Sequence, residues 1–237
     1  MKQVLYPANE RGFNDIGWLK ANFSFSFGPY YNPEKENFGV LRVLNDDIIA
    51  AGRGFGAHPH DNMEITTIVL KGALEHKDSM GNVGVINAGD VQVMSAGTGV
   101  THSEYNPSST EATQSLQIWI FPKERNIKPR YDQKSFVEAL VHNQLTTLIS
   151  PDKNATDTLW LNQDTTFSMG KFDAGQQIRY SIKTPGNGAY VFVLEGGVGI
   201  GGNQLNKRDA IGVYDISSFT IETNSETHLL IIEVPML

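Results

Sequence analysis

The sequence predicts an antiparallel all-β protein made of two similar β-barrels in tandem. Short runs rich in Val, Ile, Thr and aromatic residues cover most of its 237 residues. Turn-forming Gly, Asn and Asp interrupt these runs at the spacing of about 8 to 12 residues that is typical of all-β sandwiches and barrels. The pattern of the first half also recurs in the second half, as expected for a duplicated β unit.

The first half shows the strand pattern most clearly. Apolar or alternating runs occur in "FGVLRVLND", "MEITTIVLKG", "VGVINAGDVQVMSAG" and "SLQIWIFP". The stretch "HKDSMGNVGVI" predicts a hairpin whose turn lies near Gly81 and Asn82, because Gly and Asn tolerate the backbone conformations of tight turns. These strands form the predicted first barrel, residues 1–130.

Helix signals are scarce, and the best one lies near the middle of the chain. "DQKSFVEALVHNQL", residues 132–145, places Phe136, Val137, Leu140 and Val141 at helical spacing. We therefore expect a helical linker over residues 131–145. Strand patterns resume in "TTLISPD" and continue to "HLLIIEVP", which predicts a second barrel over residues 146–237.

Two pairs of segments indicate that the halves are repeats of one unit. "ITTIVLKGALEH" resembles "YVFVLEGGVGIG", with a strand, a charged residue, a glycine and another strand in each. Asp90 and Asp209 hold similar places before a strand. The alternative is that any two β domains share such patterns. The second half lacks paired histidines, so we expect it to be a degenerate barrel without metal that covers one face of the first.

Composition excludes several classes of function. No apolar run reaches the length of about 18 to 20 residues that a membrane-spanning helix needs, and "MKQVLYPANERGF" lacks the apolar core of a signal peptide. We therefore expect a cytoplasmic protein with no membrane contact. The formal net charge of -7, without a basic cluster, argues against nucleic acid as a partner. The absence of cysteine excludes disulfides and thiolate metal sites.

Two pairs of side chains predict a metal site. His58 and His60 stand two residues apart in "GAHPHDN", as do His102 and Glu104 in "GVTHSEYN". Side chains at i and i+2 of a strand point to the same face, so two such strands can direct four ligands to one point. Pro59 cannot donate to a strand ladder and belongs at an edge, a strand start or a bulge.

Three imidazoles and one carboxylate suit a divalent transition metal. We favour Fe(II), and Cu, Ni, Mn and Zn fit the same ligand types. Four protein ligands on an octahedral ion leave two positions open, whereas structural zinc sites typically use cysteine, which this chain lacks. The pattern therefore indicates a site that performs chemistry.

One further acidic candidate and three further histidines lie outside these two pairs. Three roles are open to Glu64, which follows the first pair: a fifth metal ligand, a residue that orients a metal-binding histidine, or a solvated strand residue. His76 in "LEHKDSMGN" is expected in a hairpin near the mouth of the site. His142 and His228 are expected to be structural or surface residues.

The motifs resemble those of a known family. "GRGFGAHPHDNMEITTIVLKG" and "GDVQVMSAGTGVTHSEYN" resemble the two cupin motifs, although the intervals Glu64 to Gly72 and Gly97 to His102 are longer than usual. Together with "FSFSFGPYYNP", "EHKDSMGN" and "LQIWIFP", they resemble the pirin family of bicupins. The similarity is dense from Phe23 to Tyr131 and thin beyond.

This resemblance implies a fold, a site and an activity. Pirin-like proteins have two cupin barrels, with metal only in the first, and their ligands match His58, His60, His102 and Glu104; Glu64 is then not a metal ligand. Bacterial members are associated with quercetin 2,3-dioxygenase activity, which makes this chain a candidate oxidoreductase that opens a flavonol or related enol with O2. Animal members are described as nuclear transcription cofactors, so the alternative is a non-catalytic redox sensor that binds a protein partner.

A mechanism follows from these expectations. The substrate hydroxyl must lose its proton, and Glu104 is the expected base. Four apolar residues near the motifs are candidates for the wall of the substrate pocket: Phe55, Met63, Met94 and Trp119. Alternation along strands makes some of these four point away from the pocket.

Overall fold

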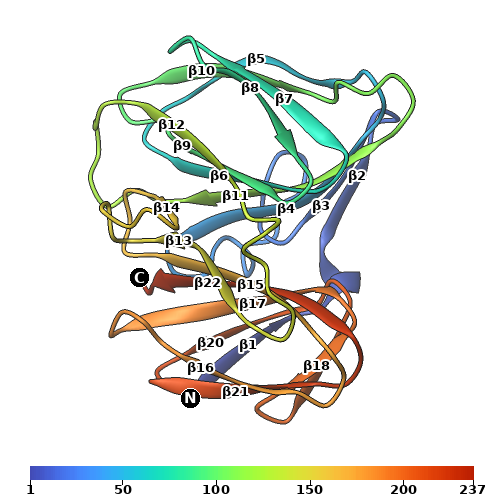
Figure 1. The fold of residues 1–237 in the computed structure, drawn as a ribbon, viewed down its shortest axis with the longest axis vertical. Coiled ribbons are helices and arrows are strands. Elements are labelled where there is room, and N and C mark those ends of the chain that lie inside the picture. The colour runs from blue at the N-terminus through green and yellow to red at the C-terminus, as the bar shows by residue number, and fades with distance from the viewer.

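The computed structural model describes all residues, 1–237, and consists of two stacked β-barrels (Figure 1). A seven-stranded sheet and a four-stranded sheet form each barrel. This confirms the predicted all-β fold with two barrels. The only helix is the 3-10 turn η1, Ala8–Glu10. The chain forms no helix with the length and hydrophobicity that a membrane span requires.

The first barrel, at the top of Figure 1, joins two antiparallel sheets. Its large sheet has the order β12 (Arg130–Ser135), β9 (Asp90–Ser95), β6 (Glu64–Lys71), β11 (Thr113–Ile120), β4 (Leu41–Ile49), β3 (Leu19–Phe23) and β2 (Gly12–Asp15). Its small sheet has the order β5 (Gly54–His60), β10 (Val100–Tyr105), β7 (Ala73–Asp78) and β8 (Val83–Asn87).

The second barrel repeats this arrangement. Its large sheet has the order β1 (Lys2–Tyr6), β20 (Ala210–Tyr214), β17 (Asn187–Glu195), β22 (Thr227–Pro235), β15 (Thr166–Phe172), β13 (Thr146–Ser150) and β14 (Leu159–Trp160). Its small sheet has the order β16 (Gln177–Ser181), β21 (Ser218–Thr223), β18 (Gly197–Ile200) and β19 (Asn203–Asn206).

Equivalent turns support the internal repeat. Asp90 Oδ2 accepts a hydrogen bond from the backbone N–H of Asn87 at 2.9 Å, and Asp209 Oδ2 accepts one from Asn206 at 2.8 Å. Gly72 and Gly196 join matching strands, with φ angles of 76° and 81° that only glycine adopts readily. The two barrels thus use the same turn chemistry at the same points of the fold.

The predicted helical linker is wrong. Residues 130–135 form strand β12, which pairs with β9 from Arg130↔Ser95 to Ser135↔Asp90. Beyond it Phe136 is buried, whereas Val137 and Val141 are 60% and 50% exposed, so the apolar residues share no helical face. The ladder with β9 satisfies backbone groups that a helix would otherwise pair internally.

The two barrels also depart from the predicted domain limits of residues 1–130 and 146–237. β1 pairs with β20 from Lys2↔Tyr214 to Tyr6↔Ala210, so the first strand of the chain completes the second barrel. In Figure 1 this blue strand lies in the lower barrel among orange and red ones. The first barrel, conversely, extends beyond residue 130 to include β12.

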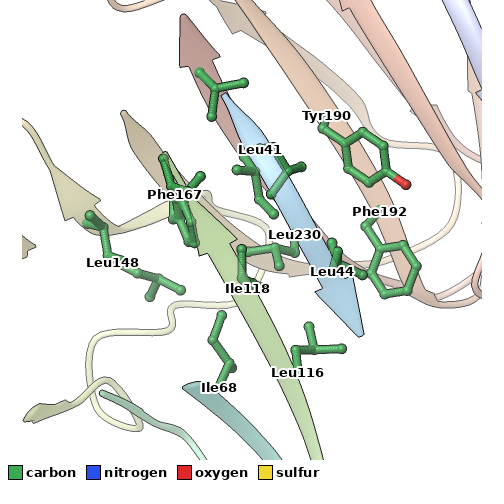
Figure 2. Close-up of a cluster of buried hydrophobic side chains, with 14 of the residues drawn as sticks. Leu41, Leu44, Ile68, Leu116, Ile118, Leu148, Phe167, Tyr190, Phe192 and Leu230 are labelled. Atoms are coloured by element: carbon green, nitrogen blue, oxygen red, sulfur yellow. The ribbon is translucent and has the colours of Figure 1, made fainter. Parts of the chain in front are cut away.

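The main core lies between the two large sheets. It contains 26 buried residues from both barrels, and Figure 2 shows Leu44, Leu116 and Ile118 facing Phe192 and Leu230. Residues that alternate with these point into the first barrel. On β11, for example, Gln117 and Trp119 line an internal cavity. The first barrel therefore packs one apolar face against the second barrel and encloses both smaller apolar clusters and polar residues between its own two sheets.

Candidate metal centre

Three imidazoles converge inside the first barrel, as the alternation of β5 and β10 predicts. The strands are antiparallel with His58 opposite His102, and the ladder is irregular between His102 and Glu104. The ligand atoms of His58, His60 and His102 lie within 4.8 Å of one another. β5 is the edge strand of its sheet, which explains how it accommodates Pro59.

The nitrogen positions suit a shared ion. His60 Nε2 and His102 Nε2 are 2.9 Å apart, a distance that suits one N–H···N bond or two bare nitrogens on one metal. Imidazole nitrogens bound at about 2.0–2.1 Å to one ion stand about 3 Å apart when adjacent. His58 Nδ1 lies 2.8 Å from the carbonyl oxygen of Gly56, and donation to that oxygen leaves Nε2 bare.

The electrostatics of the site keep two of these rings neutral. Burial, aided by His58, lowers the pKa of His60 to about 4. Burial and the neighbouring histidines lower the pKa of His102 to about 3. Because only a neutral imidazole can bind metal, both rings are ready ligands at neutral pH. The residues present thus fit a divalent metal.

Glu104 lies beside the histidines, and hydrogen bonds hold its carboxylate in place. Its two carboxylate oxygens each accept from Gln117 Nε2 at 2.9 Å, and Thr67 Oγ1 lies 3.3 Å from Oε1. Burial raises its pKa, against the opposing effect of Gln117. The close group that contains Glu104 is formed with His76 and His102. Its expected role as fourth ligand stays a prediction.

His76 lies within the site, whereas the sequence placed it in a hairpin near the mouth of the site. Its exposed fraction is 0%, and it stands opposite Glu104 in the β7–β10 ladder. The predicted hairpin itself is confirmed, since β7 and β8 pair around a turn that contains Gly81. The missed signal is the i and i+2 spacing of His76 and Asp78, the same one that identified the other pairs.

A cavity of about 230 Å³ opens onto the imidazoles. Of the four expected wall residues, Phe55 and Trp119 line it. Met63 and Met94 do not: Met94 is fully buried in a separate cluster with Ile65, and Met63 packs against that cluster. The cavity wall therefore includes two of the four expected residues: Met94 pairs with Ile65 in the β6–β9 ladder and shares its face, but only Ile65 reaches the cavity, and Met63 precedes β6.

Several wall residues were missed by the sequence reasoning. Phe27, Asn45, Asp47, Ile65 and Gln117 complete the lining together with the histidines and Glu104. Asn45 and Asp47 alternate on β4, so the "NDD" of "VLNDD" carried a usable signal. Burial, with Asp46 and Glu104 nearby, raises the pKa of Asp47 to about 8. Its carboxyl is therefore largely protonated at neutral pH.

Glu64 does not hydrogen-bond to a histidine of the site, although the sequence made it a candidate to orient one. Its Oε2 accepts from Ser95 Oγ at 2.7 Å and from the backbone N–H of Asn162 at 3.0 Å. Asn162 lies between β14 and β15 of the second barrel. Glu64 therefore fastens the two barrels together. The other two histidines lie apart from the site: His142 pairs with Asp173, and His228 lies opposite Lys171.

Comparisons with known proteins agree with this architecture. The family model described as Pirin matches residues 6–120, and the one described as Quercetinase C-terminal cupin domain matches residues 147–234. The chain is 42% identical over 231 residues to a quercetin 2,3-dioxygenase of Escherichia coli, covering 98% of both chains. It is 40% identical to a pirin-like protein of Caulobacter vibrioides, covering 96% of this chain and 97% of that one.

A solved structure shows the same fold. A bacterial pirin from Escherichia coli, crystallised with nickel(II), superposes with a TM-score of 0.93 at 40% identity, and the match covers 100% of both chains. A quercetin 2,3-dioxygenase from Acinetobacter baumannii matches with a TM-score of 0.79 at 22% identity, covering 98% of this chain and 86% of that one. At that identity the likeness concerns the fold alone.

Proposed function

From the premise that this chain belongs to the pirin family, we propose that it is a metal-dependent dioxygenase of the quercetin 2,3-dioxygenase type. One observation carries the proposal. Three imidazoles, two of them with Nε2 atoms 2.9 Å apart, face a cavity walled by Phe27, Phe55 and Trp119. Convergent metal-ligand types beside an apolar pocket are typical of a catalytic site.

The proposed ligands are His58, His60, His102 and Glu104. We propose Fe(II) as the native metal because mixed imidazole and carboxylate sites with open positions suit it, and the nickel complex of the Escherichia coli pirin supports a divalent ion. When bound, the metal supplies Lewis acidity that lowers the pKa of a substrate hydroxyl.

Glu104 is the proposed base. Its buried carboxyl has a raised pKa, which favours uptake of a proton from a substrate hydroxyl near neutral pH. Gln117 donates to both oxygens at 2.9 Å and so fixes the plane of the carboxylate. Thr67, on the neighbouring strand β6, holds Oε1 from another direction. Proton transfer to Glu104 thus takes place at a fixed and buried position.

The aromatic walls favour a flat substrate. Trp119 contacts the ring of His60 edge to face at 4.9 Å and that of Phe27 at 5.2 Å. Such rings stack on planar aromatic molecules and exclude water. The volume of about 230 Å³ lies below the usual range for ligand cavities, about 300–1,000 Å³. A three-ring flavonol would therefore place its reacting ring inside and extend the rest outward.

The alternative reading, a metal-binding regulator without catalysis, needs no such cavity. An aromatic pocket in direct contact with the imidazoles supports the enzyme instead. The proposed partners are accordingly a flavonol or related enol and O2.

The test begins with metal analysis of the purified protein. The Fe(II)-loaded protein and Ni(II)- and Cu(II)-loaded samples are then assayed for oxygen uptake with quercetin and with smaller enols. We expect substrate-dependent oxygen consumption that a chelator abolishes. If every metal form leaves oxygen unchanged with every substrate, the dioxygenase proposal fails.

A further inference from the structure

A buried carboxylate and imidazole stand in line behind one of the proposed metal ligands. His76 and Asp78 follow each other at i and i+2 on β7 and face β10, with Asp78 opposite His102 in the ladder. His102 Nδ1, on the ring edge away from His60, lies 3.4 Å from His76 Nδ1. His76 Nε2 in turn lies 3.2 Å from Asp78 Oδ2.

The far end of this line is an acceptor held in place by several donors. Asp78 Oδ1 accepts from the backbone N–H groups of Met80 and Asn82 at 2.9 and 3.0 Å. Its Oδ2 accepts from Asn82 Nδ2 at 2.9 Å as well as facing His76. These bonds come from the turn "DSMGN" between β7 and β8, so the turn fixes the carboxylate.

Water is excluded from the line. The side chains of His76 and Asp78 are both 0% exposed. Tyr131, from β12, lies against the ring of His76 with centroids 4.7 Å apart. The hydrogen-bond partners of His76 in the structure are His102 and Asp78, as expected for a polar side chain shielded from bulk water.

Proton counting along the line gives a single consistent pattern for neutral rings. A carboxylate only accepts, so His76 Nε2 carries the proton and donates to Asp78. A neutral imidazole has one N–H, which leaves His76 Nδ1 as an acceptor. His102 Nδ1 must then carry its proton and donate to His76, and its Nε2 is bare.

We propose that Asp78 and His76 form a relay that locks the tautomer of His102, so that Nε2 of His102 always faces the metal as a lone pair. The inference rests on the proposed metal site and deepens it. His76 is here a positioning residue, which also makes His102 a stronger donor to the metal. Gly56 serves His58 in the same way through its carbonyl oxygen, 2.8 Å from Nδ1.

The first test is the tautomer of His102 in the metal-free wild-type protein, measured by long-range ¹H–¹⁵N NMR. The relay predicts an N–H at Nδ1 and a bare Nε2. An N–H at Nε2, or a doubly protonated His76, overturns the proposal. This measurement needs neither a variant nor bound metal, so it stands even if the dioxygenase proposal fails.

The second test reverses the relay with Asp78→Asn. The amide keeps the shape and leaves its oxygen to the backbone donors, but it presents an N–H₂ group to His76 Nε2. His76 must then donate from Nδ1, which forces His102 into the tautomer protonated at Nε2. We expect the affinity for Ni(II), measured by competition with a chelator, to fall about 10- to 100-fold, as for other partners of metal-binding histidines.

Asp173→Asn is the matched control. Asp173 contacts His142 Nε2 at 2.9 Å on the surface of the second barrel, so the same exchange there leaves Ni(II) affinity unchanged. His76→Phe removes the acceptor for His102 Nδ1 and should weaken Ni(II) binding as Asp78→Asn does. If Asp78→Asn binds Ni(II) as tightly as wild type, the relay is wrong while the metal site stands. If wild type binds neither Ni(II) nor Fe(II), the proposed function fails. The relay is then tested by the NMR measurement of the His102 tautomer alone.

Discussion

Glu64 of the first barrel accepts a hydrogen bond from the backbone N–H of Asn162, a residue 98 positions further along the chain. The same oxygen accepts from Ser95 Oγ, and Glu64 is fully buried. A strand residue of one barrel thus binds a loop of the other through a shared carboxylate oxygen. The sequence placed Glu64 near the metal, and the structure gives it a different task.

Glu64→Ala is expected to lower the free energy of unfolding by about 3 kcal/mol, because it leaves the Ser95 hydroxyl and the Asn162 N–H buried without an acceptor. Urea denaturation measures the loss, and metal content should stay that of wild type. Glu64→Gln retains one acceptor oxygen and should lose less. Loss of metal at unchanged stability would show instead that Glu64 supports metal binding.

His102→Ala and His58→Ala are each expected to lower bound metal well below one equivalent, since each removes one of three convergent imidazoles. Elemental analysis of protein reconstituted with Fe(II) or Ni(II) gives the stoichiometry. His142→Ala is the control, because that ring is exposed and bound to Asp173. Unchanged metal content in His102→Ala contradicts the ligand assignment.

Glu104→Gln removes the proposed base while preserving size. We expect oxygen uptake with substrate to fall about 100-fold or more, the usual contribution of general base catalysis. Some metal should remain bound through the imidazoles, so activity is expressed per bound metal. Glu226→Gln, at an exposed position, controls for the loss of one charge. Full activity per metal in Glu104→Gln argues against the assigned role.

Trp119→Ala opens the aromatic wall of the cavity. We expect the KM for a flavonol to rise about 2- to 12-fold, the equivalent of one aromatic pair contact, with metal content unchanged. Trp160→Ala is the matched control, because Trp160 stacks with Arg130 and Lys153 away from the cavity. Equal KM values for the two variants would exclude Trp119 from substrate binding.

His228 gives the folded protein a pH-dependent stability. Burial, with Lys171 and Arg208 nearby, lowers its pKa to about 4, whereas the unfolded chain titrates near 6.5. As pH falls from 6.5 to 4, His228 binds a proton in the unfolded state but not in the folded state. The stabilising contribution is therefore complete above pH 6.5 and is lost towards pH 4.

His228→Gln lacks this titration. Between pH 7 and 4, wild type should lose about 2–3 kcal/mol more than the variant, measured on metal-free protein by urea denaturation at several pH values. All other titrating groups are common to both proteins and cancel in the difference. Parallel stability curves would mean that His228 is not buried as a neutral ring.

Much of the candidate site could be predicted because strands have a period of two. That period places His58 with His60 and His102 with Glu104, whatever the rest of the chain does. The same rule could not decide Met63 or Met94. Met63 lies outside a strand, and Met94 shares the face of Ile65 without lining the cavity, because alternation fixes the face of a residue and not its distance from the cavity.

The sequence by itself determined the local features of this protein: the strands, the Gly81 hairpin and the pairing of His58 with His60 and of His102 with Glu104 at i and i+2. These depend on backbone preference and on neighbours a few residues away. Tertiary structure alone decided that β1 completes the second barrel, that residues 130–135 form a strand instead of a helix, and that His76 lies behind His102. Each depends on a contact between segments far apart in the chain, whose free energy is absent from any local pattern.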